Sequence, residues 1–321
     1  MQTVRVACHA MATRFEVLLH GPDPIALRAA GEEALREIER LEAQLSLYRE
    51  TSEVACINAQ AARKPVRVTP SLFALFQRAQ TLSAQTGGAF DITVAPLVRC
   101  WGFMHGTGHV PSPEALAEVR ASVGMRHLLL DPEALTVRFS RPGVMIDLGG
   151  IGKGYAIDLA AEALRDCGIT SALLHGGTSS LYAIGRPPGQ EAWKVAIDGP
   201  PQGSSPQPGS SPAPAPARTF ATVALRDQAM SVSAIWGKSF QAEGKTMGHL
   251  LDPRTGQPAT SAVLAAVVLP SGTEAEAFST ALVILGSDGQ ERLSRLRPGM
   301  GNLLVRESGG EYQVQCRNLQ S

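Results

Sequence analysis

The chain lacks the cysteine pattern of a disulfide framework or a zinc centre. Its five cysteines, among 321 residues, are widely spaced and include no C-x-x-C pair. The chain therefore lacks the cysteine spacing typical of zinc ligands and of paired disulfide cysteines. We therefore expect reduced and mostly buried thiols. An excess of positive charge is also missing, because Lys plus Arg and Asp plus Glu both number 29. Without a basic excess or stripe, no nucleic-acid partner is expected.

Long apolar runs are absent as well. No segment reaches the roughly 18 uninterrupted apolar residues that a membrane-spanning helix needs, so no membrane span is expected. The chain enters its first alternating segment without a charged start, a sustained apolar stretch or a cleavage site. We therefore expect no signal peptide, an unlipidated Cys8 and a cytoplasmic location. The 44% of hydrophobic and 18% of charged residues are typical of a globular enzyme rather than a disordered chain.

Two common nucleotide signatures are missing from the most glycine-rich turn, which reads VMIDLGGIGKGYAID over residues 144–158. Lys153 is followed by Gly154 instead of Ser or Thr, which excludes a P-loop, and the glycines form G-x-G-x-G, which excludes the Rossmann fingerprint. A short apolar strand, a flexible turn, a helix start and one lysine remain, and together they suit a phosphoryl group. The segment predicts a phosphate site of another class, with a purely structural turn as the alternative.

Hydrophobic periodicity predicts alternating helices and strands along most of the chain. We expect a strand over 3–20, helices over 22–50 and 71–86, a helix over 112–123 that Ser112 caps, a hairpin of 127–130 and 136–139, and a helix from the glycine turn to about Cys167. Residues 199–218 are rich in Pro, Ser, Gly and Ala and show no apolar period. This composition predicts a flexible surface insertion rather than a binding element.

Further motifs lie before and after the glycine turn. Read in chain order together with that turn, they resemble the ApbE family, the FAD:protein FMN transferases. They are MAT at 11–13, LSLYR at 45–49, TGGAFDITVAP at 86–96, HGG at 175–177, WKVAID at 193–198, HLLDPRTG at 249–256 and EAFSTA at 276–281. The resemblance extends from about Ala7 to about Val305, and the ordered combination is far more specific than any single motif. It implies an α+β fold with mixed sheets flanked by helices, forming one catalytic domain over residues 1–321 in two intimately packed halves.

The resemblance also implies an activity. Family members bind FAD as substrate, use a divalent cation that is usually Mg²⁺, and transfer FMN to a threonine or serine of a flavin-accepting protein, with release of AMP. Such a reaction needs positive charge on the pyrophosphate and a base for the incoming hydroxyl. Two alternatives remain open: a metal-dependent FAD pyrophosphatase with water as acceptor, and a non-catalytic FAD-binding protein.

The resemblance assigns the cation to the Gly152 carbonyl together with Glu276 and Thr280. The two side chains are four residues apart in a helical run, so they should share one face about one turn apart. Without the family context, a solvent-facing Glu and a Thr bonded to the preceding turn would be the simpler interpretation. The family usually has Asp where this chain has Glu276, which makes the choice of metal an open question because Mg²⁺ demands near-ideal octahedral geometry.

The same resemblance assigns the remaining roles. His249 is the candidate base, since its ordinary pKa allows it to accept a proton near neutrality, and Lys153 is the candidate phosphate ligand. Residues expected around the flavin and its nucleotide are Met11, Thr13, Ser46, Tyr48, Asp91, Lys153, Asp158, Trp193 and Asp198. Three positions depart from the family pattern: Ala12 replaces a frequent glycine, Thr178 a frequent Asp or Asn, and the Ser233–Ala234 pair a usual Thr-Ser or Ser-Gly.

Overall fold

The computed structural model describes residues 1–104, 106, 108–201, 217–242 and 245–320. Its centre is an eight-stranded sheet in the order β1-β2-β6-β7-β10-β13-β14-β15, in which every neighbouring pair is antiparallel. The strands are β1 (Gln2–Ala10), β2 (Thr13–Gly21), β6 (Ser171–Gly176), β7 (Ser180–Gly185), β10 (Gln228–Ala234), β13 (Leu264–Leu269), β14 (Gly301–Ser308) and β15 (Glu311–Arg317). The predicted α+β class is confirmed, although antiparallel pairing replaces the mixed sheets that we expected.

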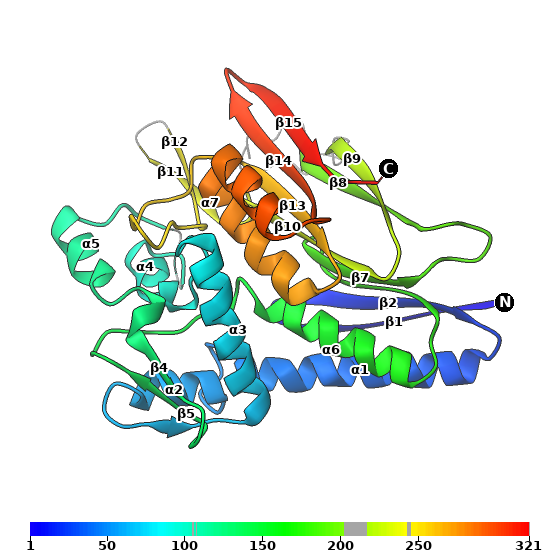
Figure 1. Cartoon of the computed structure of the whole chain (residues 1–321), viewed down its shortest axis with the longest axis horizontal. Helices are drawn as coiled ribbons and strands as arrows, with labels where there is room; N and C mark the ends of the chain where they lie inside the picture. Colours follow the sequence, from blue (N-terminus) through cyan, green and yellow to red (C-terminus); the bar gives the residue numbers. More distant parts are fainter. Residues whose placement is uncertain (105, 107, 202–216, 243–244, 321) are drawn as a thin grey trace, which may run out of the picture.

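Three helices cover one face of this sheet: α1 (Pro24–Leu45), α6 (Gly152–Asp166) and α7 (Gly272–Leu296). In Figure 1, α1 and α6 lie side by side beneath β1 and β2, while α7 lies over β10 and β13. Their apolar stripes close the main core, where Ile38, Ala160 and Phe278 are fully buried. Gly286 interrupts α7 with a φ of 65°, a backbone geometry that glycine adopts without strain.

A two-stranded ribbon, β8 (Trp193–Pro201) and β9 (Ala217–Leu225), packs on the opposite face. Trp193, Ile197 and Leu225 of the ribbon form a second apolar cluster with Met230 and other residues of the sheet. Because both faces are covered, the central strand β13 is buried along its whole length. Its sequence is therefore continuously apolar instead of alternating.

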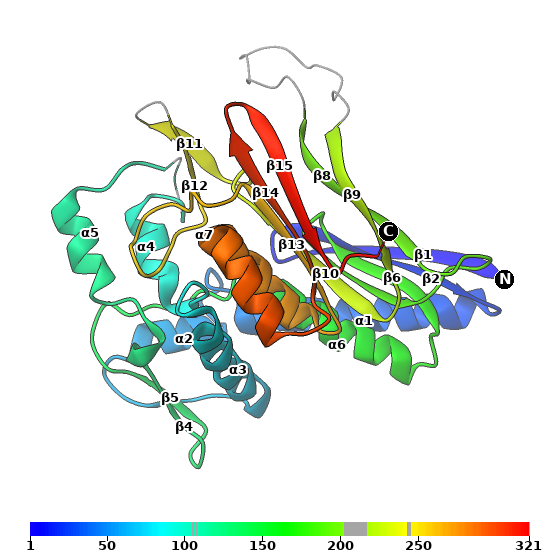
Figure 2. The same ribbon diagram turned by 45° about the horizontal axis from the view of Figure 1, so that its top comes forward.

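The remaining elements gather at one end of the main sheet (Figure 2). They are α2 (Glu53–Gln60), α3 (Pro70–Thr86), α4 (Ala95–Cys100), α5 (Pro113–Arg120), the short turns η1 (Ile92–Val94) and η2 (Met125–His127), a small sheet of β3 (Val66–Arg67), β5 (Thr136–Phe139) and β4 (Leu128–Asp131), and the hairpin β11 (Ser239–Ala242) and β12 (Lys245–Gly248). None of the helices that the structure describes is long and apolar enough to cross a membrane.

Most of the predicted helices are confirmed, as is the 127–139 hairpin. Ser112 caps α5 through its side chain, and Gly87 ends α3 with a φ of 62°. The single strand expected over 3–20 is instead a hairpin, because Met11 and Ala12 turn the chain with φ values of 50° and 58°. Of the insertion expected at 199–218, residues 199–201 and 217–218 belong to the ribbon strands and residues 202–216 lie outside the described residues.

Two further expectations were wrong. The apolar residues before the glycine turn form no strand, because the Ile146 N–H donates to the Asn58 side chain at 2.7 Å and the Asn58 amide donates back to the Ile146 carbonyl at 3.0 Å. A side chain thus replaces the neighbouring strand. The cysteines are free as predicted, but none is fully buried, and Cys167 and Cys316 are exposed.

Candidate active site

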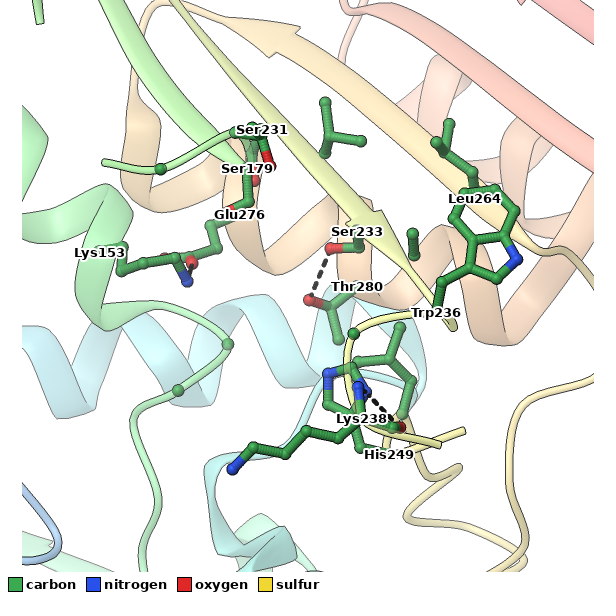
Figure 3. A pocket seen from close by; sticks show the side chains of 18 of the residues that line it. Lys153, Ser179, Ser231, Ser233, Trp236, Lys238, His249, Leu264, Glu276 and Thr280 are labelled. Carbon is green, nitrogen blue, oxygen red and sulfur yellow. Dashed lines mark hydrogen bonds and ion pairs between the residues drawn. The ribbon is translucent and has the colours of Figure 1, made fainter. Parts of the chain in front are cut away.

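A cavity of about 900 Å³ lies where the start of α6, the first half of α7, the end of β10 and residues 236–251 meet (Figure 3). This volume is within the range of about 300–1,000 Å³ that is typical of small-molecule sites. The lining combines apolar side chains such as Phe90, Phe103 and Trp236 with convergent polar groups. Of the predicted site residues, the lining contains Tyr48, Asp91, Lys153, Asp198, His249, Glu276 and Thr280.

The glycine turn and α7 meet at a buried carboxylate. Glu276 is 3% exposed, and its Oε2 accepts a hydrogen bond from the Gly154 N–H at 2.7 Å. The Lys153 ammonium forms an ion pair with the other oxygen, Oε1 (Figure 3). A buried carboxylate is tolerated when it is paired and hydrogen-bonded, and the positive end of helix α6 favours it further. The start of α6 therefore holds an anionic group of the chain itself, the Glu276 carboxylate, and the phosphate role of Lys153 stays a prediction.

Close approach of the two helix starts requires a glycine at position 154. A Cβ built there would lie 2.2 Å from the Gly272 carbonyl oxygen, which is far inside van der Waals contact. One turn further along α6, the Asp158 carboxylate accepts hydrogen bonds from the N–H groups of Gly272 at 2.6 Å and Thr273 at 2.9 Å. Asp158 thus fixes the start of α7 and lies outside the cavity lining. Its assignment to the surroundings of the phosphates stays a prediction.

Glu276 and Thr280 lie one turn apart on α7 and both line the cavity. The described residues contain no group of three or more His, Cys, Asp or Glu side chains that could hold a metal. A cation here would therefore need hydroxyl, carbonyl or phosphate oxygens beside the one carboxylate. Glu276 and Thr280 supply oxygen donors of the kind that Mg²⁺ prefers, so they fit such an ion.

Gly152, the third predicted cation ligand, is the buried first residue of α6 and is not part of the lining. Its N–H donates to the Leu148 carbonyl at 2.7 Å, which ties the turn to the helix. The role of its carbonyl stays a prediction. A Cβ at this position would meet only the Leu148 Cβ, at 3.8 Å. This is an ordinary van der Waals distance, so a methyl group at position 152 would cause no clash.

His249 follows the β11–β12 hairpin, and the backbone of Lys238 at the other side of that hairpin holds its ring. The Nδ1 atom lies 3.1 Å from the Lys238 carbonyl oxygen and 3.3 Å from the Lys238 nitrogen (Figure 3). Burial lowers the pKa of His249 below its ordinary value, and the positive charges of Lys238 and Lys153 act in the same direction. When Nδ1 donates to the carbonyl, Nε2 carries the lone pair of a neutral base.

Two aspartates beside the cavity are stabilised by different partners. Asp91 accepts hydrogen bonds from the Thr93 N–H at 2.8 Å and the Met125 N–H at 3.0 Å, so it shapes the loop that lines the cavity. Burial raises the pKa of Asp91 against the effect of these bonds. Burial also raises the pKa of Asp147. The hydrogen bond from the Gly149 N–H and the positive charges of Lys153 and Lys238 act in the opposite direction and lower this pKa.

Besides Asp158, four residues predicted to contact the flavin or its nucleotide lie outside the lining. The Met11 N–H donates to Glu42, Ser46 ends α1, and Trp193 stacks on His20 with ring centroids 5.6 Å apart. Thr13 lies close to the cavity wall. A Cβ built on the lining residue Gly177 would be 2.6 Å from the hydroxyl oxygen of Thr13. The assignment of these four residues to the flavin stays a prediction.

Sequence reasoning assigned no role to several polar residues of the lining, among them Asp147, Lys238, Ser179 and Ser231. Ser233 was recognised only as part of a pair that departs from the family pattern. Lys238 could have been found from a hairpin pattern that pairs it with His249, since the His249 N–H donates to its carbonyl at 2.9 Å. Ser233 carries no local signal, because its partners belong to α7.

The chain is similar to known proteins in both sequence and fold. A sequence model of the ApbE family matches residues 11–304. An FAD:protein FMN transferase of Treponema pallidum is 30% identical over 310 residues, which cover 92% of this chain and 82% of the relative. Among solved structures, the ApbE protein of Thermotoga maritima superposes with a TM-score of 0.83 at 27% identity, covering 97% of this chain and 96% of that one. The flavinyl transferase ApbE of Pseudomonas stutzeri, in its apo form, gives 0.82 at 28% identity, with 98% and 94% covered.

Proposed function

The chain belongs to the ApbE family, and from that premise we propose that it transfers FMN from FAD to a threonine or serine hydroxyl of a target protein with the help of Mg²⁺. The observation that carries the proposal is the convergence of Lys153, Glu276 and His249 on one cavity. They supply a cation for phosphoryl oxygens, a carboxylate for a metal and a neutral base. These three groups are what the splitting of a pyrophosphate by a hydroxyl requires.

Glu276 and Thr280 would hold the Mg²⁺ ion, which when bound neutralises charge on the pyrophosphate oxygens. Lys153 lies next to this pair at the first turn of α6. In the proposed reaction its ammonium contacts a phosphoryl oxygen, and the start of helix α6 adds a favourable field. Asp158 keeps α7 in place, so the two ligands on that helix stay fixed relative to Lys153.

The proton of the acceptor hydroxyl is assigned to His249. Its lowered pKa keeps the ring neutral, and in the tautomer in which Nδ1 donates to the Lys238 carbonyl, Nε2 is free to accept. The hydroxyl oxygen forms a bond to the phosphorus of the FMN half as the bond from that phosphorus to the bridging oxygen breaks. AMP leaves with the bridging oxygen, and the hydroxyl proton passes to Nε2.

Two other activities remain as outcomes of a single experiment. The protein is incubated with FAD and Mg²⁺, with and without a peptide that carries a flavinylation motif, and AMP is quantified by chromatography. AMP that appears only with the peptide supports transfer. AMP without the peptide indicates a pyrophosphatase, and tight FAD binding without AMP indicates a binding protein.

A further inference from the structure

A row of three hydroxyl groups runs from the cavity wall into the protein. Thr280 on α7 lies 3.2 Å from the hydroxyl oxygen of Ser233 on β10 (Figure 3), and Ser233 lies 2.8 Å from the hydroxyl oxygen of Ser279. Thr280 lines the cavity, whereas Ser279 is fully buried between α7 and the sheet. Each hydroxyl has one proton to donate, so the row must have a direction.

The direction follows from the bonds at the buried end. Ser279 donates to the Glu276 carbonyl at 3.0 Å and to the hydroxyl oxygen of Ser231 at 3.2 Å, so its single proton is shared between these two acceptors. In its contact with Ser233, Ser279 must therefore accept. The proton of Ser233 is used in that bond, and Ser233 must in turn accept from Thr280. The protons of Thr280 and Ser233 consequently both point along the row toward Ser279.

A hydroxyl that has given its proton to a neighbour retains only acceptor capacity. The Thr280 oxygen therefore presents lone pairs on its cavity side, as a metal ligand must. We propose that Ser233 and Ser279 are positioning residues that orient the Thr280 hydroxyl for a divalent cation. This inference rests on the proposed function, specifically on Thr280 acting as a ligand beside Glu276. It explains why a buried polar row is retained between a strand and a helix that otherwise pack through apolar groups.

The test measures cation affinity directly, with Mn²⁺ as the probe and no FAD present, by electron paramagnetic resonance of the free ion. Ser233→Ala removes the acceptor for the Thr280 proton and should weaken Mn²⁺ binding about three- to tenfold, the range of one hydrogen bond. Ser233→Thr keeps a hydroxyl and should restore most of the affinity. Ser231→Ala is the matched control: it removes a different partner of Ser279 on the same strand, so Mn²⁺ affinity should change less than about twofold.

A double-mutant cycle separates orientation from a structural effect. Thr280→Val deletes the ligand, and Ser233→Ala added to it should cause no further loss, because Ser233 acts only through the Thr280 hydroxyl. Circular dichroism and thermal melts check that each variant is folded. If Thr280→Val weakens Mn²⁺ binding but Ser233→Ala does not, or if Ser233→Ala has the same effect in both backgrounds, the inference is overturned while the cation site stands. If Thr280→Val leaves the affinity unchanged, the cation role within the proposed function fails as well.

Discussion

The Glu276 carboxylate accepts a hydrogen bond of 2.7 Å from the Gly154 N–H, a residue 122 positions earlier in the chain. The contact joins the starts of two helices and places the only acidic ligand of the proposed cation site at the positive end of α6. Lys153 pairs with the other carboxylate oxygen. The groups proposed for the metal and for the pyrophosphate are therefore in contact with one another, and a change in either one is expected to alter the other.

Replacement of Glu276 by Gln removes the negative charge but keeps the shape of the side chain. We expect AMP release from FAD to fall about a hundredfold or more, on the scale of losing one electrostatic stabiliser of a transition state. FAD affinity should weaken only moderately. The matched control is Glu274→Gln on the same helix, which contacts Arg297 at 3.3 Å away from the cavity and should keep its activity. Full activity of the Glu276 variant would remove this residue from the site.

Gly154→Ala tests the close approach of α6 and α7. The added methyl group would lie 2.2 Å from the Gly272 carbonyl oxygen, so the helices must separate, and the free energy of unfolding should fall by about 1–3 kcal/mol or more. Gly152→Ala, whose Cβ has ordinary space, should leave the stability unchanged or raise it by up to about 1 kcal/mol. Urea unfolding measures both, and equal effects of the two changes would argue against the proposed contact.

The pH dependence of the reaction follows from the lowered pKa of His249. A neutral ring accepts the proton, so kcat/KM should stay high down to a pH below 6.5, the ordinary histidine value, and fall only beneath it. Lys238→Met removes a positive charge that lowers this pKa. The pKa should then rise and the acidic limb of the profile should move to higher pH, whereas Lys238→Arg should keep its position. A limb that does not respond to Lys238→Met would exclude His249 as the titrating base.

The Met11–Ala12 turn stores backbone strain at the end of the first hairpin. Both residues have positive φ, the conformation for which two-residue hairpin turns favour Asn and Gly. Ala12→Gly should raise the free energy of unfolding by up to about 1 kcal/mol, because relief of left-handed strain outweighs the added freedom of the unfolded chain. Ala10→Gly in the preceding strand has no such strain to relieve and should destabilise the protein. Destabilisation by both substitutions would contradict this interpretation.

Much of the local structure could be predicted from the sequence. The caps at Ser112 and Gly87, the helix after the glycine turn and the shared face of Glu276 and Thr280 all depend on neighbours within a few residues. The family resemblance extended this to the overall fold, because ordered motifs identify a family even where single motifs do not.

The family resemblance brought the glycine turn and Glu276 together, but the individual contacts between distant residues could not be predicted. The apolar run at 144–148 has the composition of a strand, yet the amide of Asn58 takes the place of a partner strand. Lys153 was expected to contact a phosphate, and only the fold reveals that Glu276 is its neighbour. Asp158 was likewise placed by its motif, whereas its hydrogen bonds depend on where α7 begins. Each of these outcomes is decided by packing across more than 80 residues of sequence.

The most direct test is the mass of an acceptor peptide after incubation with the protein, FAD and Mg²⁺. Two peptides are compared that differ only in a threonine or an alanine at the acceptor position, and AMP is measured in the same samples. We predict that the threonine peptide gains one FMN unit for each AMP released, that the alanine peptide gains none, and that the Glu276→Gln protein labels neither. Release of AMP without a mass change in the threonine peptide, or equal labelling of both peptides, would contradict the proposed transfer.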